Sequence, residues 1–315
     1  MKITTEFSAQ PEDWQALLRQ CPWNVFIYGG EQSSKEERCR TVLNYFSKPQ
    51  IAVIGVNRQD KRHYAYQLHA DGLVKNYEGT VEFKQALDSS LPNDDLHILL
   101  DLTSLELDII LNLLPSLVEK KPASLFGLYL VPETYGKVPD DRLKLLTIAQ
   151  PRGYVSFLPG ISRRSQNTAH FILLGFDEGR AKYFIEQYDW DARQIHALIG
   201  DPSYVPDGVE KAKKANREWL VTLPESNIHR IDAHLADDIS RFFDRQFQQY
   251  ELMDIVPQGP KPMLLGFLLF YLRLSEAERA RIRILYDFPI PRPGCTAGIS
   301  HGYLYDCNGL IANDA

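Results

Sequence analysis

The chain has 315 residues, of which 44% are hydrophobic and 24% charged, and 41 acidic and 35 basic residues give a formal net charge of −6. This composition is typical of a globular protein with one large domain or two of medium size. No run of like charges marks a basic or acidic tail, so a nucleic-acid-binding surface is not indicated. Four cysteines form no C-x-x-C pair, which favours reduced thiols over a zinc site or a disulfide framework.

The N-terminal segment is polar and lacks the apolar core of a signal peptide. The longest apolar run, 263–272, is much shorter than the roughly 20 residues that a membrane-spanning helix needs. We therefore expect a cytoplasmic protein without a membrane segment.

Short apolar runs, typical of strands buried on both faces, alternate along the chain with segments of helical periodicity. The expected strands are 24–30, 51–57, 96–102, 124–131, 170–176, 194–200, 252–257 and 281–288. The helical segments between them include 34–46, 81–90, 101–114, 178–188, 237–251 and 257–270. This alternation predicts an α/β fold with mostly parallel sheets.

The first four expected strands match the last four in order, in their helical connections and in the glycine that ends the first strand of each set. We therefore predict two Rossmann-like units, 1–160 and 161–315, with an internal duplication as one explanation. The polar Pro- and Gly-containing stretch 159–165 marks the expected boundary. A crossover within one continuous sheet is the alternative.

Ligands of open α/β sheets bind beyond the carboxyl ends of the strands, where the N–H groups and dipole of the next helix favour an anion. Four strand-to-helix junctions and loops supply candidate ligand-binding residues: Gly29, Gly30, Asp101, Thr103, Ser104, Gly175, Gly179, Arg180, Gln258, Gly259, Lys261 and Arg292. We expect a nucleotide or another phosphorylated small molecule as the ligand.

The turn Gln258-Gly-Pro-Lys-Pro262 carries the clearest signal among these junctions. Its glycine lets the backbone approach a phosphate closely, and Lys261 places a positive charge in the first turn of a helix. A tight turn with a solvated lysine is the alternative, but a charge in so apolar a setting favours a function.

The other junctions are less specific. Glycine spacing at Gly175 and Gly179 falls short of a full G-x-G-x-x-G motif, although Arg180 could bind a phosphate. Asp101, Thr103 and Ser104 are also residue types that cap helices. Arg292 belongs to a Pro- and Gly-containing loop that could cover a site or simply connect two elements.

No G-x-S-x-G, H-E-x-x-H or G-x-x-x-x-G-K-[ST] motif occurs, and the eight histidines form no group with metal-ligand spacing. His97 and His170 each begin an apolar strand, where a hydrogen-bonded structural histidine is the usual explanation. The sequence therefore indicates no metal and no cofactor, and it favours binding over catalysis.

The strand, the Gly-containing turn with lysine and the apolar helix that starts Lys-Pro-Met resemble the Gly-Gly-Thr-Lys junction of CRISPR-associated Rossmann-fold (CARF) sensor domains. The resemblance covers this junction and the general α/β pattern, and the chain has Gln-Gly-Pro-Lys at this position. It implies a sensor that binds cyclic oligoadenylate across a dimer interface in prokaryotic antiviral defence, with Gly29, Gly30, Gly259 and Lys261 around the phosphates.

Three classes of function therefore stay open. The first is a ligand-sensing regulator that acts as a homodimer or with a partner protein. The second is an enzyme acting on a phosphorylated metabolite or nucleotide, which a perturbed carboxylate or histidine in the same cleft as Lys261 would favour. The third is a non-catalytic scaffold subunit of a multiprotein complex.

Overall fold

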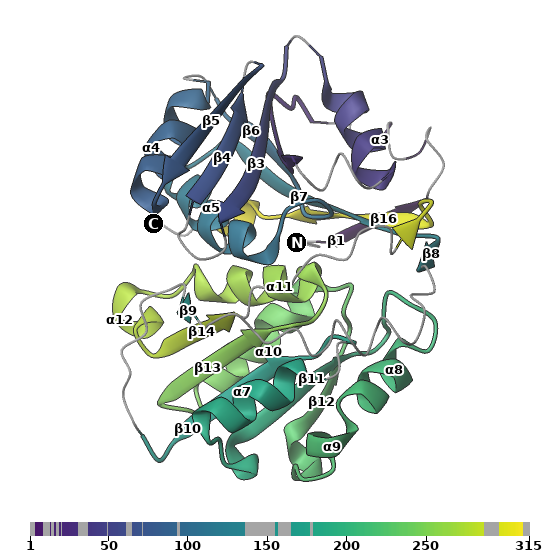
Figure 1. Cartoon of the computed structure of the whole chain (residues 1–315), viewed down its shortest axis with the longest axis vertical. Helices are drawn as coiled ribbons and strands as arrows, with labels where there is room; N and C mark the ends of the chain where they lie inside the picture. Colours follow the sequence, from purple (N-terminus) through teal and green to yellow (C-terminus); the bar gives the residue numbers. More distant parts are fainter. Residues whose placement is uncertain are drawn as a thin grey trace. The chain divides into compact units, whose positions relative to one another are not determined.

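The computed structural model describes residues 4–8, 13, 16, 19, 21–30, 37–60, 65–135, 155–156, 165–286 and 296–310, except 49, 71, 93–94 and 177–178. The chain divides into two compact units, each with its own main sheet (Figure 1). Unit 1 comprises Met1–Lys137 and Arg292–Ala315, and unit 2 comprises Val138–Pro291.

This division differs from the predicted boundary between residues 160 and 161. The last segment of the chain belongs to unit 1, because β16 (His301–Asp306) pairs antiparallel with β7 (Ser124–Val131). Part of the predicted first unit belongs to unit 2, because β9 (Val155–Ser156) pairs with β14 (Ile282–Tyr286). The pairing of strands that lie far apart in the sequence does not change the local composition, so the sequence did not mark this boundary.

The sheet of unit 1 is parallel at its centre and antiparallel toward both edges. Its order is β1 (Thr4–Ser8), β16, β7, β6 (His97–Asp101), β2 (Val25–Gly29), β3 (Ala52–Asp60), β4 (Ala65–Ala70) and β5 (Leu73–Glu78). A separate two-stranded pair joins β8 (Thr134–Tyr135) to β15 (Thr296–Ala297).

The helices of unit 1 are α3 (Glu37–Phe46), α4 (Thr80–Ser90) and α5 (Leu107–Glu119) within the described residues. Residues Val42 and Phe46 of α3 pack with Phe26 of β2 and Leu99 of β6 in one apolar core. Helix α5 is buried along most of its length, as its nearly continuous apolar sequence predicts.

The sheet of unit 2 has the order β12 (Ile228–Ile231), β11 (Ile195–Gly200), β10 (Thr168–Leu173), β13 (Leu252–Pro257), β14 and β9. All of these pairs are parallel except that of the edge strand β9. Numbered along the chain from β10 to β14, the parallel strands run 3-2-1-4-5, which is the Rossmann order.

The helices of unit 2 are α7 (Arg180–Tyr188), α8 (Gly208–Ala215), α9 (Arg217–Leu220), α10 (Ala236–Phe247), α11 (Lys261–Tyr271) and α12 (Glu276–Arg279). Residues of α7, α8 and α9 share a core with Ile172 of β10 and Val256 of β13. On the opposite face, Phe171 contacts Phe243 of α10, which contacts Phe267 of α11. The sheet is therefore covered on both faces, as in a doubly wound fold.

The predicted α/β class and both Rossmann-like units are confirmed, and each of the eight expected strands is present. The matched strands also have the same spatial order, β3-β2-β6-β7 in unit 1 and β11-β10-β13-β14 in unit 2. Two separate sheets replace the alternative of one continuous sheet. Among the described residues, no helix combines the length and apolarity that crossing a membrane requires.

Candidate functional site

The candidate site of unit 2 lies where β10 and β13 end side by side. The chain leaves β10 toward α7 on one face of the sheet and leaves β13 toward α11 on the other face. Divergence of this kind defines the switch point at which doubly wound folds bind ligands. The predicted strand 252–257 ends at the same residue as β13, and the predicted strand 170–176 extends three residues beyond β10.

The two loops that leave β10 and β13 touch through their backbones. An ideal Cβ atom on Gly175 would lie 2.3 Å from the carbonyl oxygen of Gln258, and one on Gly259 would lie 3.2 Å from that of Leu174. The backbone N–H of Gln258 donates to the carbonyl of Leu173 at 3.1 Å. Three predicted residues, Gly175, Gln258 and Gly259, are thus brought together, and the glycines allow this close approach.

Two helices begin at this edge of the sheet. Gly179 precedes α7 with φ 84°, a left-handed conformation that favours glycine, and Arg180 is the first helical residue. Lys261 is the first residue of α11 and is half-buried. Neither helix has a side-chain hydrogen bond at its N-cap, so the N-terminal N–H groups are not capped by those side chains.

The side chain of Gln258 is buried, with 8% of the residue exposed. Its Nε2 atom has no hydrogen-bond partner among the described residues. Buried amide groups are almost always hydrogen-bonded, because an unpaired donor in a dry environment costs about 1–3 kcal/mol. An unpaired donor at the start of α11 is the feature of this junction that local packing does not explain.

Asn216, which the sequence analysis did not identify, supports the same junction. It is buried, and its Nδ2 atom donates to the carbonyl oxygens of Gly175 at 3.3 Å and Ala212 at 2.9 Å. Its Oδ1 atom accepts a hydrogen bond from Trp219. An asparagine between two short helices gives no sequence signal that would separate this role from a turn.

The equivalent junction of unit 1 is closed by its own side chains. Ser104 Oγ accepts a hydrogen bond from Gly29 N–H at 2.9 Å and donates to Asp101 Oδ2 at 2.5 Å. Thr103 N–H donates to Asp101 Oδ1, and Thr103 Oγ1 accepts from Leu130 N–H. Asp101, Thr103 and Ser104 are buried, so their predicted ligand-binding groups are engaged with the protein itself.

Two more predicted residues complete the set. Gly30 follows β2 and is half-buried, with the Asn57 side chain 3.1 Å from the position of an ideal Cβ. Arg292 lies outside the described residues.

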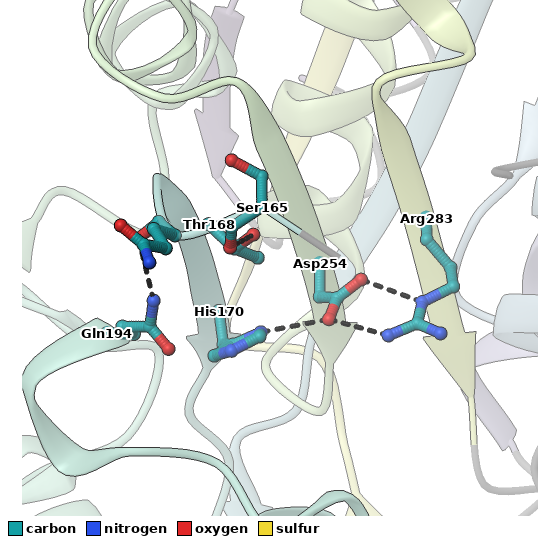
Figure 2. A network of polar contacts seen from close by, with 7 residues as sticks. Ser165, Thr168, His170, Gln194, Asp254 and Arg283 are labelled. Carbon is teal, nitrogen blue, oxygen red and sulfur yellow. Dashed lines mark hydrogen bonds and ion pairs between the residues drawn. The ribbon is translucent and has the colours of Figure 1, made fainter. Parts of the chain in front are cut away.

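A second polar site crosses the sheet of unit 2 nearer the amino ends of its strands (Figure 2). His170, Asp254 and Arg283 are register neighbours on β10, β13 and β14. Asp254 accepts from His170 Nδ1 at 2.9 Å and from Arg283 Nε and Nη2, each at 2.8 Å. This row lies on the face of the sheet that α7 covers, because Ile172 and Val256, two residues further along the strands, belong to that core.

Aromatic rings border this row. His170 stacks on Trp190 with ring centroids 4.2 Å apart, and the guanidinium of Arg283 lies 5.3 Å from the ring centroid of Tyr188. Burial raises the pKa of Asp254, but the hydrogen bonds and charges of His170 and Arg283 outweigh it and lower the pKa overall. The hydrogen bond to Asp254 raises the pKa of Arg283, so the ion pair is maintained at neutral pH.

The position of His170 at the start of an apolar strand predicted a structural role, and no motif pointed to Asp254 or Arg283 as its partners. The available signal was a charged residue in each of two otherwise apolar strands, LMDIVP and IRILY. Pairing them requires the strand order, which the sequence does not provide.

Comparison of the chain with protein-family models, curated proteins and solved structures finds no match.

Proposed function

We propose that the protein is a Rossmann-like ligand-binding protein, a sensor or regulator, whose second unit binds a nucleotide or another phosphorylated anion between the ends of β10 and β13. The observation that carries the proposal is the unpaired Nε2 donor of Gln258, buried beside the start of α11. A phosphate oxygen would give this donor its missing partner.

Three further features support an anion at this position. The start of α11 supplies the positive end of the helix dipole. Lys261, in the first helical turn, adds a full positive charge. The glycines at 175 and 259 let the two loops touch through their backbones, which holds Gln258 and the start of α11 beside the end of β10.

The proposal assigns one anion site to each chain. In unit 1 the side chain of Asp101, the last residue of β6, accepts hydrogen bonds from the Thr103 N–H and Ser104 hydroxyl groups. A phosphate there would have to displace a buried, hydrogen-bonded carboxyl group. We therefore place Gly29 and Gly30 outside the ligand contacts.

The enzyme alternative gains no support from the row described above. Asp254 has a lowered pKa, but it is the third residue of β13, whereas Lys261 follows the end of that strand. A perturbed carboxylate or histidine would favour an enzyme only in the same cleft as Lys261. The scaffold alternative predicts that no phosphate ligand binds, which the experiment below decides.

Cytoplasmic location, a homodimer or partner protein, and a role in antiviral defence are also part of the proposal. Cys21, Cys39 and Cys307 form no disulfide within the described part of the chain, which supports a reducing compartment. The resemblance of the lysine-containing turn to that of CARF domains is the support for a dimeric sensor of cyclic oligoadenylate.

The test is a thermal-shift screen against mononucleotides, dinucleotides, cyclic oligoadenylates and inorganic phosphate. A ligand at 100 times its Kd adds about 2.7 kcal/mol to stability, so moderate affinity is visible. Gln258→Leu should abolish the shift while leaving the ligand-free melting temperature unchanged or higher, because leucine removes an unpaired buried amide. Lys261→Ala should weaken binding, and Lys213→Ala on the exposed side of α8 is the matched control.

Two results would contradict the proposal. One is a screen in which no phosphate-bearing compound shifts the melting temperature. The other is a Gln258→Leu variant that melts much lower but binds its ligand as tightly as the unaltered protein.

A further inference from the structure

The row of His170, Asp254 and Arg283 lines a pocket of about 540 Å³ in unit 2. Tyr188 and Trp190 form its aromatic wall, and Thr168 and Gln194 add polar groups to its lining. The size lies within the range of about 300–1,000 Å³ that small-molecule sites occupy. The pocket lies near the amino ends of the strands, whereas the proposed anion site lies at their carboxyl ends.

The hydrogen bonds within the row determine which donor and acceptor atoms remain for a ligand. Asp254 is ionised, so both of its oxygens only accept, and they bind Arg283 and His170. His170 therefore carries a proton on Nδ1, and in the neutral ring its Nε2 atom is an acceptor. Figure 2 shows both side chains directed at the same carboxylate from neighbouring strands.

Arg283 keeps donors that Asp254 does not use. A guanidinium has five N–H groups, and Asp254 takes one from Nε and one from Nη2. Within the described part of the chain, neither Arg283 Nη1 nor His170 Nε2 has a hydrogen-bond partner. The Arg283 side chain is 25% exposed, so its outer edge is accessible, whereas the Asp254 side chain is 7% exposed.

The charge of the row selects the ligand. Arg283 and Asp254 neutralise each other, so this ion pair has no net charge to balance an anion. Bringing an unpaired anion into a partly buried pocket is costly, whereas an uncharged group that satisfies both free atoms is not. The group must accept from Arg283 and donate to His170.

We propose that this pocket is a second binding site, for an uncharged planar group that carries a hydrogen-bond donor beside an acceptor. A primary carboxamide and the amino edge of cytosine share this chemistry. The carbonyl oxygen of the carboxamide, or N3 of cytosine, accepts from Arg283, and the amino N–H group donates to His170 Nε2. The aromatic wall contacts the rest of the planar ligand.

The test compares benzamide with benzoate, which have nearly the same shape but differ in charge and in the N–H donor. Binding is measured by calorimetry and by the fluorescence of Trp190, with Trp190→Phe as the control that removes the local signal. We expect benzamide to bind at least tenfold more tightly than benzoate. Cytosine tests the nucleobase alternative. Binding of cytosine alone would show that the site takes the group on a nucleobase, and binding of benzamide alone would show that it takes a carboxamide.

Two variants locate the site. Arg283→Lys keeps a positive charge for Asp254 but loses the planar fork, and His170→Gln keeps a donor for Asp254 but loses the ring acceptor. Each should weaken benzamide at least tenfold, whereas Lys261→Ala at the other end of the strands should leave it unchanged. The comparison of benzamide with benzoate uses the unaltered protein, so it tests the proposal even if a variant does not fold.

The proposal is overturned if neither benzamide nor cytosine binds, if benzoate binds as tightly as benzamide, or if both variants bind normally. None of these outcomes bears on the phosphate screen with Gln258→Leu, so the two sites succeed or fail separately.

Discussion

Gly175 and Gln258 are in backbone contact at the ends of β10 and β13, where an ideal Cβ on Gly175 would lie 2.3 Å from the Gln258 carbonyl oxygen. Gly29 and Ser104 repeat this relationship in unit 1 at 2.2 Å. Real Cβ atoms essentially never approach a heavy atom so closely. The two contacts explain why each unit has a glycine at the end of its first matched strand.

Gly175→Ala should therefore destabilise unit 2, because the new methyl group forces two strand ends apart. We expect a loss of about 1–3 kcal/mol, the usual cost of overpacking, in the free energy of unfolding measured with urea. Gly309→Ala is the control, since an ideal Cβ there meets no atom within 4 Å. Equal stability of the two variants would show that the loops separate freely.

Ser104→Ala should destabilise unit 1 by about 1–3 kcal/mol, because it leaves the Gly29 N–H group and an Asp101 oxygen without their shared partner. Ser89→Ala is a matched control, since that exposed hydroxyl bonds only the Gln85 carbonyl within its own helix. Thermal unfolding followed by circular dichroism measures both. A silent Ser104→Ala would mean that Asp101 and Gly29 find other partners, and the argument for a closed junction would then fail.

Asp254→Asn should cost about 3 kcal/mol, because it leaves the charge of Arg283 without its buried partner. The double variant Asp254→Leu with Arg283→Met should recover much of this loss, since neither charge then remains buried. Glu218→Gln is the control: its ion pair with Lys182 is exposed and should contribute less than about 1 kcal/mol. A double variant as unstable as Asp254→Asn would show that packing, and not charge, sets the cost.

The sequence predicts the strands of both units because buried parallel strands are continuous apolar runs, as in HFILLGF and SLFGLYLV. It does not predict β4 and β5, where only part of the hairpin is buried and the residues 65–78 are mixed polar and apolar. It also assigns β16 to the wrong unit, because nothing in HGYLYD indicates which distant strand it pairs with.

The residues of the candidate site, like the strands, can be predicted from the sequence only in part. Gly175, Gln258, Gly259 and Lys261 were identified because the ends of parallel strands meet at one edge of a sheet. The closed network around Asp101 was not predicted. The same polar residue types serve in internal hydrogen bonds and in ligand contacts, so their presence does not distinguish the two. Asp254 and Arg283 likewise depend on strand order, which three-dimensional pairing supplies.

Two histidines on the other face of the unit 2 sheet should make the stability of the protein decline as the pH falls. His196 Nδ1 lies 3.0 Å from His229 Nε2, and His196 Nε2 lies 3.1 Å from the Tyr250 hydroxyl. Burial, together with the charges of His229 and His170, lowers the pKa of His196 to about 4, and burial lowers that of His229 as well.

Because the folded pKa of His196 lies below its ordinary value of 6.5, the unfolded chain takes up the proton first as the pH falls. This contribution to stability is fully present above pH 6.5 and is lost between pH 6.5 and about 4. Each histidine can change the unfolding free energy by at most about 1.4 kcal/mol per pH unit in this window.

Calorimetric unfolding of the protein and of His196→Gln from pH 4.5 to 7.5 measures the effect. The variant should show a smaller decline toward low pH, because glutamine keeps a hydrogen bond but cannot be protonated. Acidic side chains also titrate in this range, so the difference between the two proteins, and not the decline itself, reports on His196. His301→Gln, outside this cluster, should leave the decline unchanged, and parallel curves for all three proteins would show that the buried pair does not couple folding to protonation.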